Sequence, residues 1–297
     1  MSTLSEDDKL SRLLEGGWDT HVHPGPDVIP RRFDVVWLAA ALKTAGMRGA
    51  VIKSHAMPTF NLAAVMKFYS DVRLVGSIAL NPPVGGFNPW AVEACLRVGK
   101  GVVFMPTYSA AHHMNSPYSV SRDTHPYALP KGGGLSVLGG NGEVIPEVME
   151  ILALIRDRDG VLSTGHLSPR ESLAVVHAAK EVGVKRIVIT HASVDMIDMP
   201  QDMQVQLAQL GCLIEHVYLA CTDVSKIRRK SPAEVASDIR AVGSEHCVIG
   251  TDVGLPQLPD SVQALRSFIK MLMEEGISES EISRMVRHNP EMLFSEG

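Results

Sequence analysis

Eight short apolar segments recur along this chain of 297 residues, and they constrain its fold more than any other feature. They cover residues 17–23, 50–55, 73–80, 101–107, 161–166, 186–191, 212–216 and 247–252. Runs this short and this apolar are typical of parallel strands that are covered on both faces. Alternation of eight such strands with helices predicts an α/β fold, a single (β/α)8 TIM barrel over residues 1–297.

Helix starts can be read between these segments. Ser168, Ser231 and Ser278 each stand three residues before a glutamate, which is the pattern of a capping box. A dinucleotide-binding fold would instead need a Gly-x-Gly-x-x-Gly loop after the first strand, and residues 21–24 read His-Val-His-Pro. We therefore expect a closed barrel rather than an open doubly wound sheet.

One long loop after the fourth strand breaks the alternation. It covers residues 108–141, contains a predicted hairpin around an Asn-Gly turn, and carries His112, His113, Tyr118 and His125. Loops in this position lie over the mouth of a barrel. The segment is therefore a candidate lid, with a flexible surface loop as the alternative.

Composition excludes several classes of function. The formal net charge of -5 argues against a nucleic-acid-binding protein, and no apolar run approaches the roughly 18 residues of a membrane span. The first 14 residues are polar, unlike a signal peptide, and the four cysteines form no Cys-x-x-Cys pair. We expect a cytoplasmic protein that acts on a small molecule, with neither nucleic acid nor membrane as partner.

Histidines gather at the predicted strand ends. His21 and His23 close the first strand, and alternate residues of a strand face the same way, so both can point into the barrel mouth. Such a pair is half of a zinc-type site, although chance also explains a lone His-x-His. The fifth, sixth and eighth strands end in His166, His191 and Asp252. Four strands that end in this way indicate a metal site.

In these residues the chain resembles the amidohydrolase superfamily over nearly its whole length. The resemblance includes the Asn-Pro element of residues 287–294. Residues 21–26, 51–59 and 104–107 are further similar to a group within it that is known only as a domain of unknown function. That finer resemblance names no substrate.

The resemblance implies a ligand set. His21, His23 and Asp252 would bind a first divalent metal. His166 and His191 would bind a second, or one of them would contact the substrate in a mononuclear enzyme. Asp252 would also be the general base for the attacking water, and Asp252 and His191 are the predicted catalytic residues. Zinc is the expected metal, and manganese, iron, cobalt and nickel fit the same ligands.

One residue departs from the pattern of the superfamily. Members with two metals usually carry a bridging carboxylated lysine or a glutamate on strand four, where residues 103–107 read Val-Phe-Met-Pro-Thr. Lys53 ends the second strand instead, and a lysine cation is disfavoured beside a metal. Our hypothesis is a carboxylated Lys53 that bridges two metals. The alternatives are a lysine that contacts substrate or one that pairs with an acid.

Four residues are predicted to bind substrate, namely His55, His112, Arg31 and Arg32. An arginine fork suits a carboxylate or a phosphate, so the substrate is expected to be anionic. One of Glu215 and His216 should also face the mouth, but the strand register leaves the choice open.

The leading functional hypothesis is metal-dependent hydrolysis of an amide, cyclic imide, lactone or ester. The main alternative is a mononuclear nonoxidative decarboxylase on the same barrel. Two weaker alternatives are a phosphoesterase of the polymerase-and-histidinol-phosphatase type and an inactive barrel that serves as a binding protein. A homo-oligomer is left open by analogy with other barrel enzymes.

Overall fold

The computed structural model describes residues 5–119, 133–223 and 230–294. Within these residues the strands pair in parallel and in chain order, as one run of three and one run of six. The first run is β1 (Trp18–Val22), β2 (Gly49–Ile52) and β3 (Arg73–Val75). The second is β4 (Ser77–Ala79), β5 (Val102–Phe104), β6 (Val161–Ser163), β7 (Arg186–Ile189), β8 (Leu213–Val217) and β9 (Cys247–Gly250).

The predicted strand at residues 73–80 is divided into β3 and β4 at Gly76. The backbone of helix α3 (Phe60–Met66) packs directly on this glycine, where a Cβ atom would lie 2.6 Å from Cα of Phe60. The carbonyl of Gly76 still accepts a hydrogen bond from the Val102 amide at 3.0 Å. The two pieces therefore continue one barrel strand, and each of the eight predicted segments contains a strand.

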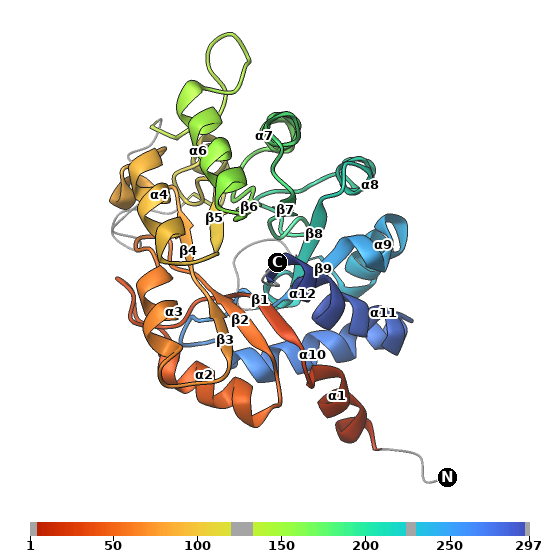
Figure 1. Cartoon of the computed structure of the whole chain (residues 1–297). Helices are drawn as coiled ribbons and strands as arrows, with labels where there is room; N and C mark the ends of the chain where they lie inside the picture. Colours follow the sequence, from red (N-terminus) through yellow and green to blue (C-terminus); the bar gives the residue numbers. More distant parts are fainter. Residues whose placement is uncertain (1–4, 120–132, 224–229, 295–297) are drawn as a thin grey trace.

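The last strand meets the first at the opposite seam. Val22 and Val253 form a parallel bridge, and the His23 amide donates to the Val253 carbonyl at 2.8 Å. The Asp252 amide donates to the His21 carbonyl at 2.7 Å. Figure 1 shows the resulting ring of strands with helices around it. These bonds hold the ends of β1 and β9 together, where the predicted ligands lie.

Most of the helices lie around the outside of the ring (Figure 1). Besides α3, the described helices are α1 (Glu6–Leu14), α2 (Val35–Thr44), α4 (Pro89–Val98), α5 (Ala111–Asn115), α6 (Pro146–Asp157), α7 (Pro169–Val182), α8 (Gln201–Gln209), α9 (Pro232–Val242), α10 (Ser261–Glu274), α11 (Glu279–Ser283) and α12 (Asn289–Phe294). The 3-10 helices η1 (Pro82–Val84), η2 (Tyr218–Cys221) and η3 (Ser244–His246) and the π-helix η4 (Arg284–His288) complete the described elements. The three predicted capping boxes are present, at the starts of α7, α9 and α11.

The barrel interior is packed at its amino-terminal end. Trp18, Phe104 and inward valines from the strands meet Leu293 and Phe294 of α12, and the Trp18 and Phe294 rings lie 5.1 Å apart. Figure 1 shows α12 close to the centre of the ring. Because side chains fill this end, the carboxyl ends of the strands are the open face of the barrel.

The long loop after β5 folds back on itself. Ala110 bridges Leu135, and Leu138 forms an antiparallel bridge with Val144, as the predicted hairpin requires. The short helix α5 lies between β5 and this hairpin. Residues 120–132, which include His125, lie outside the described residues. None of the described helices combines the length and apolarity needed to cross a membrane.

Candidate metal centre

Three predicted ligands converge at the carboxyl ends of β1 and β9. Asp252 Oδ1 lies 3.0 Å from His23 Nε2 and 3.4 Å from His21 Nε2. The donor atoms of all three residues lie within 4.8 Å of one another. With zinc–nitrogen bonds of about 2.0–2.1 Å, neighbouring ligand atoms of a tetrahedral zinc lie about 3.3 Å apart. The set therefore fits one divalent cation.

Two of the predicted site residues adopt a left-handed backbone. His191 has φ 27° and Asp252 has φ 55°. This conformation is uncommon outside glycine, although Asp tolerates it better than most residues, and strained backbone of this kind clusters at functional sites. Both residues stand two positions after the last residue of their strands, β7 and β9.

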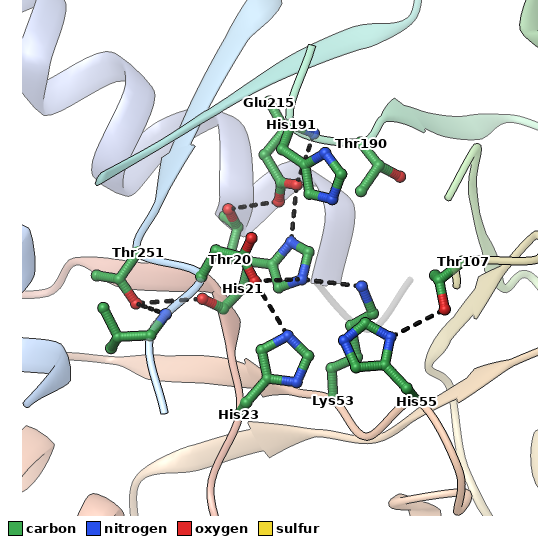
Figure 2. A network of polar contacts seen from close by, with 12 residues as sticks. Thr20, His21, His23, Lys53, His55, Thr107, Thr190, His191, Glu215 and Thr251 are labelled. Carbon is green, nitrogen blue, oxygen red and sulfur yellow. Dashed lines mark hydrogen bonds and ion pairs between the residues drawn. The ribbon is translucent and has the colours of Figure 1, made fainter. Parts of the chain in front are cut away.

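Glu215 settles the register of β8. Its Oε2 atom lies 2.9 Å from His21 Nδ1 and accepts the backbone N–H of His191 at 3.1 Å, while Oε1 accepts from the Thr20 hydroxyl at 3.0 Å (Figure 2). His216 points the other way, with Nδ1 2.7 Å from the Ser193 hydroxyl. A carboxylate on Nδ1 of a histidine leaves Nε2 directed at a metal. Burial raises the pKa of Glu215 to about 8, and a bound cation would favour its ionised form.

Asp19 is a second supporting carboxylate, which the sequence interpretation missed. Its oxygens accept hydrogen bonds from the hydroxyls of Thr251 and Ser261, both at 2.6 Å, and from the Thr251 amide at 2.9 Å. Burial raises its pKa to about 6. It therefore holds β1 against β9 and α10 beneath the three ligands. The sequence feature that could have identified Asp19 is its position two residues before His21, which places the two side chains on the same face of the strand.

Lys53 lies beside the three ligands and is fully buried. Its Nζ atom is 3.0 Å from His21 Nε2 (Figure 2), and it is 4.4 Å from the centre of the Phe104 ring. Among the described residues no carboxylate lies within ion-pair distance of it, so the predicted salt-bridge alternative has no support. Burial lowers the pKa of Lys53 to about 8, against the charges of Asp252 and Glu215, which raise it.

His166 and His191 complete a chain of imidazoles around the mouth. The ring centres of His166 and His191 are 5.0 Å apart, and those of His191 and His21 are 5.5 Å apart. Burial lowers the pKa of His166 well below its usual value and that of His191 to about 3. Neutral imidazoles keep a lone pair for a metal. Within the described residues, Nδ1 of His191 and Nδ1 of His23 are buried without a hydrogen-bond partner.

His55 joins the same cluster from the end of β2. Its ring stacks on His23 at 4.8 Å, and its Nδ1 atom lies 2.9 Å from the Thr107 hydroxyl. Asn81 donates to that hydroxyl at 2.6 Å and to the His55 carbonyl at 2.8 Å. The network fixes the ring of His55, so the predicted substrate-binding residue does lie at the mouth.

The two predicted arginines lie differently. The buried Arg31 side chain donates to Asp27 Oδ2 at 2.9 Å, and its charge is close enough to lower the pKa of His23. Arg32 is exposed and donates to the Pro256 carbonyl at 3.0 Å. Both line a hollow of about 1250 Å³ bordered by residues 25–34, Trp37, Pro256 and Asp260.

The loop after β5 brings His113, which was not predicted, into the cluster. His113 is fully buried with Nδ1 3.1 Å from His166 Nδ1, whereas His112 is only half-buried on the same helix. Tyr108 also enters the cluster, with its ring centre 4.3 Å from that of His55 and 5.0 Å from that of His113. The sequence has two adjacent histidines here. Which of them is buried depends on how the helix α5 is rotated about its axis, and this rotation was not predicted.

Comparisons with known proteins agree with this architecture. An amidohydrolase from Pseudomonas aeruginosa has a similar structure, with a TM-score of 0.62, 12% identity and 98% of each chain covered. An organophosphorus hydrolase from Deinococcus radiodurans has a TM-score of 0.58 at 13% identity, covering 95% of this chain and 94% of that one. A putative 2-pyrone-4,6-dicarboxylic acid hydrolase from Pseudomonas putida has a TM-score of 0.59 at 14% identity, covering 94% and 97%.

At these identities the likeness concerns the fold alone, and it confirms the predicted barrel. No curated protein matches the chain. A family described as a family of unknown function, DUF6282, matches residues 16–215, which is more than half of the sequence. The chain therefore belongs to the DUF6282 family and has the barrel fold of the amidohydrolase superfamily.

Proposed function

We propose that this protein is a metal-dependent hydrolase that cleaves a C–N or C–O bond of a small anionic molecule. Amides, cyclic imides, lactones and esters are the substrate classes. The observation that carries the proposal is the convergence of His21, His23 and Asp252 at the open end of the barrel, with donor atoms within 4.8 Å. Barrel enzymes hold their catalytic groups in this position.

His21, His23 and Asp252 would hold the first metal ion, with zinc as the expected ion. When bound, such an ion supplies a Lewis acid that polarises a carbonyl and lowers the pKa of water. Glu215 positions His21 for this role, because it occupies Nδ1 of that ring. His166 and His191 would hold a second ion, and their buried neutral rings suit it.

Asp252 is the proposed general base. Its side chain is 13% exposed, whereas those of His21 and His23 are 0% and 4% exposed. Of the three proposed ligands of the first ion, this carboxylate is therefore the one that substrate and water can reach. A positioned carboxylate that takes a proton from attacking water contributes typically about 10²–10⁴-fold in rate. His55 flanks this position and would orient the scissile group, and His191 would do the same if the enzyme held a single ion.

We further propose that Lys53 is carboxylated and bridges the two ions. A buried ammonium group without a carboxylate partner is costly, while a neutral amine can add to CO2 to form a carbamate and release one proton. The carbamate would carry a negative charge into a cluster rich in neutral imidazoles. The two oxygens of the carbamate can bind one ion each. The end of β5, residues 103–107, has no carboxylate side chain that could bridge two ions in this way.

Arg32 is the proposed anchor for the anionic part of the substrate. It is exposed on the wall of the 1250 Å³ hollow, and its only described side-chain hydrogen bond goes to the Pro256 carbonyl. Arg31 is already paired with Asp27, so it is more suited to hold the wall of the hollow in place.

The test combines metal analysis with a substrate panel. Protein purified without added metal or chelator is assayed for ions per chain, then reconstituted with zinc or manganese and given amides, imides, lactones and esters. Metal-dependent hydrolysis of an anionic member is the expected result. Release of CO2 without hydrolysis would favour the decarboxylase, which the apolar end of β5 makes the second candidate. Failure to bind either metal would contradict both.

A further inference from the structure

We propose that His113 is a ligand of the second metal ion, which it would share with His166. This position would then be built partly from the loop after β5, and not only from strand ends. The inference rests on the proposed function, because it assumes that the barrel binds divalent metal. It adds a residue that lies outside the strand-end pattern from which the site was predicted.

The geometry of the two rings carries the inference. Nδ1 of His113 and Nδ1 of His166 face each other at 3.1 Å, and the ring centres are 5.0 Å apart with an angle of 34° between the planes. Two nitrogen ligands of one tetrahedral zinc lie about 3.3 Å apart. The pair is therefore spaced as two ligands of one ion are. It shows the same spacing as Asp252 and the histidines of the first position, which lie 3.0–3.4 Å apart.

Burial supports the same assignment. His113 and His166 are 0% and 2% exposed, and Tyr108 packs edge-on against both rings. A buried polar ring is costly unless its nitrogens are bound. A cation between the two Nδ1 atoms would be held by neutral donors in a site that solvent scarcely reaches.

The loop is folded in a way that fixes His113. The Ala111 amide donates to the Leu135 carbonyl at 2.8 Å, and the Leu135 amide donates to the Ser109 carbonyl at 2.7 Å. Gly134 lies against Ala111 so closely that a Cβ atom would be 2.2 Å from its Cα. The two arms of the loop thus clamp the start of α5, and His113 is two residues further on. A ligand held in this way is preorganised.

The competing explanation is a hydrogen bond in which one ring donates its N–H to the other and merely orients it. Loss of such an orienting partner typically weakens metal binding by about 10–100-fold. Loss of a ligand should cost more, and an amide side chain that can still hydrogen-bond to His166 should not replace it. His113→Ala and His113→Gln therefore separate the two roles.

Equilibrium dialysis against Zn²⁺, followed by metal analysis, measures ions per chain for the wild type, His113→Ala, His113→Gln and the control His112→Ala. The visible spectrum of the Co²⁺-loaded proteins reports the ligand environment. We expect two ions in the wild type and in His112→Ala. Both His113 variants should retain one ion, bound with wild-type affinity, and bind the second more than about 100-fold more weakly. The retained ion also shows that the variants are folded.

Three results would overturn the inference. Two tightly bound ions in His113→Gln would make His113 an orienting residue. A wild type that binds one ion, unchanged in His113→Ala, would leave the hydrolase proposal standing without this second position. A wild type that binds neither Zn²⁺ nor Co²⁺ would overturn the proposed function together with the inference.

Discussion

Glu215 connects His21 to His191 through a single carboxylate oxygen. Its Oε2 atom lies 2.9 Å from Nδ1 of His21 and accepts the His191 amide at 3.1 Å. One side chain of β8 thus orients His21, the proposed ligand of the first metal, and supports the left-handed backbone of His191, a proposed ligand of the second. This shared contact makes Glu215 the point at which the two positions are coupled.

Glu215→Gln should weaken metal binding without removing a ligand. The amide keeps the shape and one acceptor, but it removes the charge that would stabilise His21 with its proton on Nδ1. We expect the affinity for Zn²⁺ to fall by about 10–100-fold in a competition assay with a chromophoric chelator. Glu171→Gln is the matched control, since Glu171 is a buried carboxylate in the capping box of α7. Equal losses in both variants would argue against the role of Glu215.

Asp252→Asn should remove the general base, and with it the charge of one proposed metal ligand, while preserving the backbone. Asn tolerates a left-handed conformation about as well as Asp does, so the φ of 55° at this position is retained. We expect kcat on any substrate found in the panel to fall by about 10²–10⁴-fold, with the thermal unfolding of the protein little changed. The control is Asp198→Asn, because Asp198 is exposed and has φ 45°. Full activity in Asp252→Asn would exclude Asp252 as the base.

Carboxylation of Lys53 should be visible by NMR. Wild-type protein incubated with ¹³C-labelled bicarbonate and Zn²⁺ is expected to show a carbamate carbon signal that Lys53→Arg lacks. Lys53→Ala should lose activity and regain part of it when a short-chain carboxylate is supplied, because the free acid can occupy the vacated space. Lys43→Ala, at an exposed lysine paired with Asp71, should behave as the wild type. A wild type without the carbamate signal, yet with two bound ions, would contradict the bridge.

Much of the fold followed from local sequence signals. The strand segments were short and apolar, and Ser168, Ser231 and Ser278 marked helix starts, because a capping box is specified by residues three positions apart. The division of the third strand was not predicted. It depends on the contact between Gly76 and the backbone of Phe60, which is a tertiary contact that no local pattern encodes.

The site was predictable where strand periodicity decided it and not elsewhere. His21, His23 and Asp252 were placed together because parallel strands end at one face of a barrel. The choice of Glu215 over His216 needed the register of β8, and the choice of His113 over His112 needed the phase of a five-residue helix. A one-residue slip of the strand reverses the first choice, and neighbouring residues of a helix differ in direction by about 100°. Asp19 was overlooked because its partners, Thr251 and Ser261, come from the other end of the chain.

His216 should make the protein sensitive to acid. It is fully buried outside the metal site, against Ser193, and burial lowers its pKa to about 4, with Asp238 raising and Lys230 lowering it. In the unfolded chain the imidazole of His216 is therefore protonated as the pH falls through about 6.5, whereas in the folded protein it is protonated only near pH 4. Its contribution to stability is complete above pH 6.5 and is lost as the pH falls through this window, by up to about 3 kcal/mol.

The comparison of wild type with His216→Gln isolates this effect, because the other titrating groups are common to both proteins. Urea denaturation at several pH values is expected to show the free energy of unfolding falling more steeply toward pH 4 in the wild type than in the variant. His177→Gln, at an exposed position on α7, should keep the wild-type slope. If the wild type and His216→Gln lose stability in parallel, His216 is protonated in the folded protein and its burial does not exclude the charge.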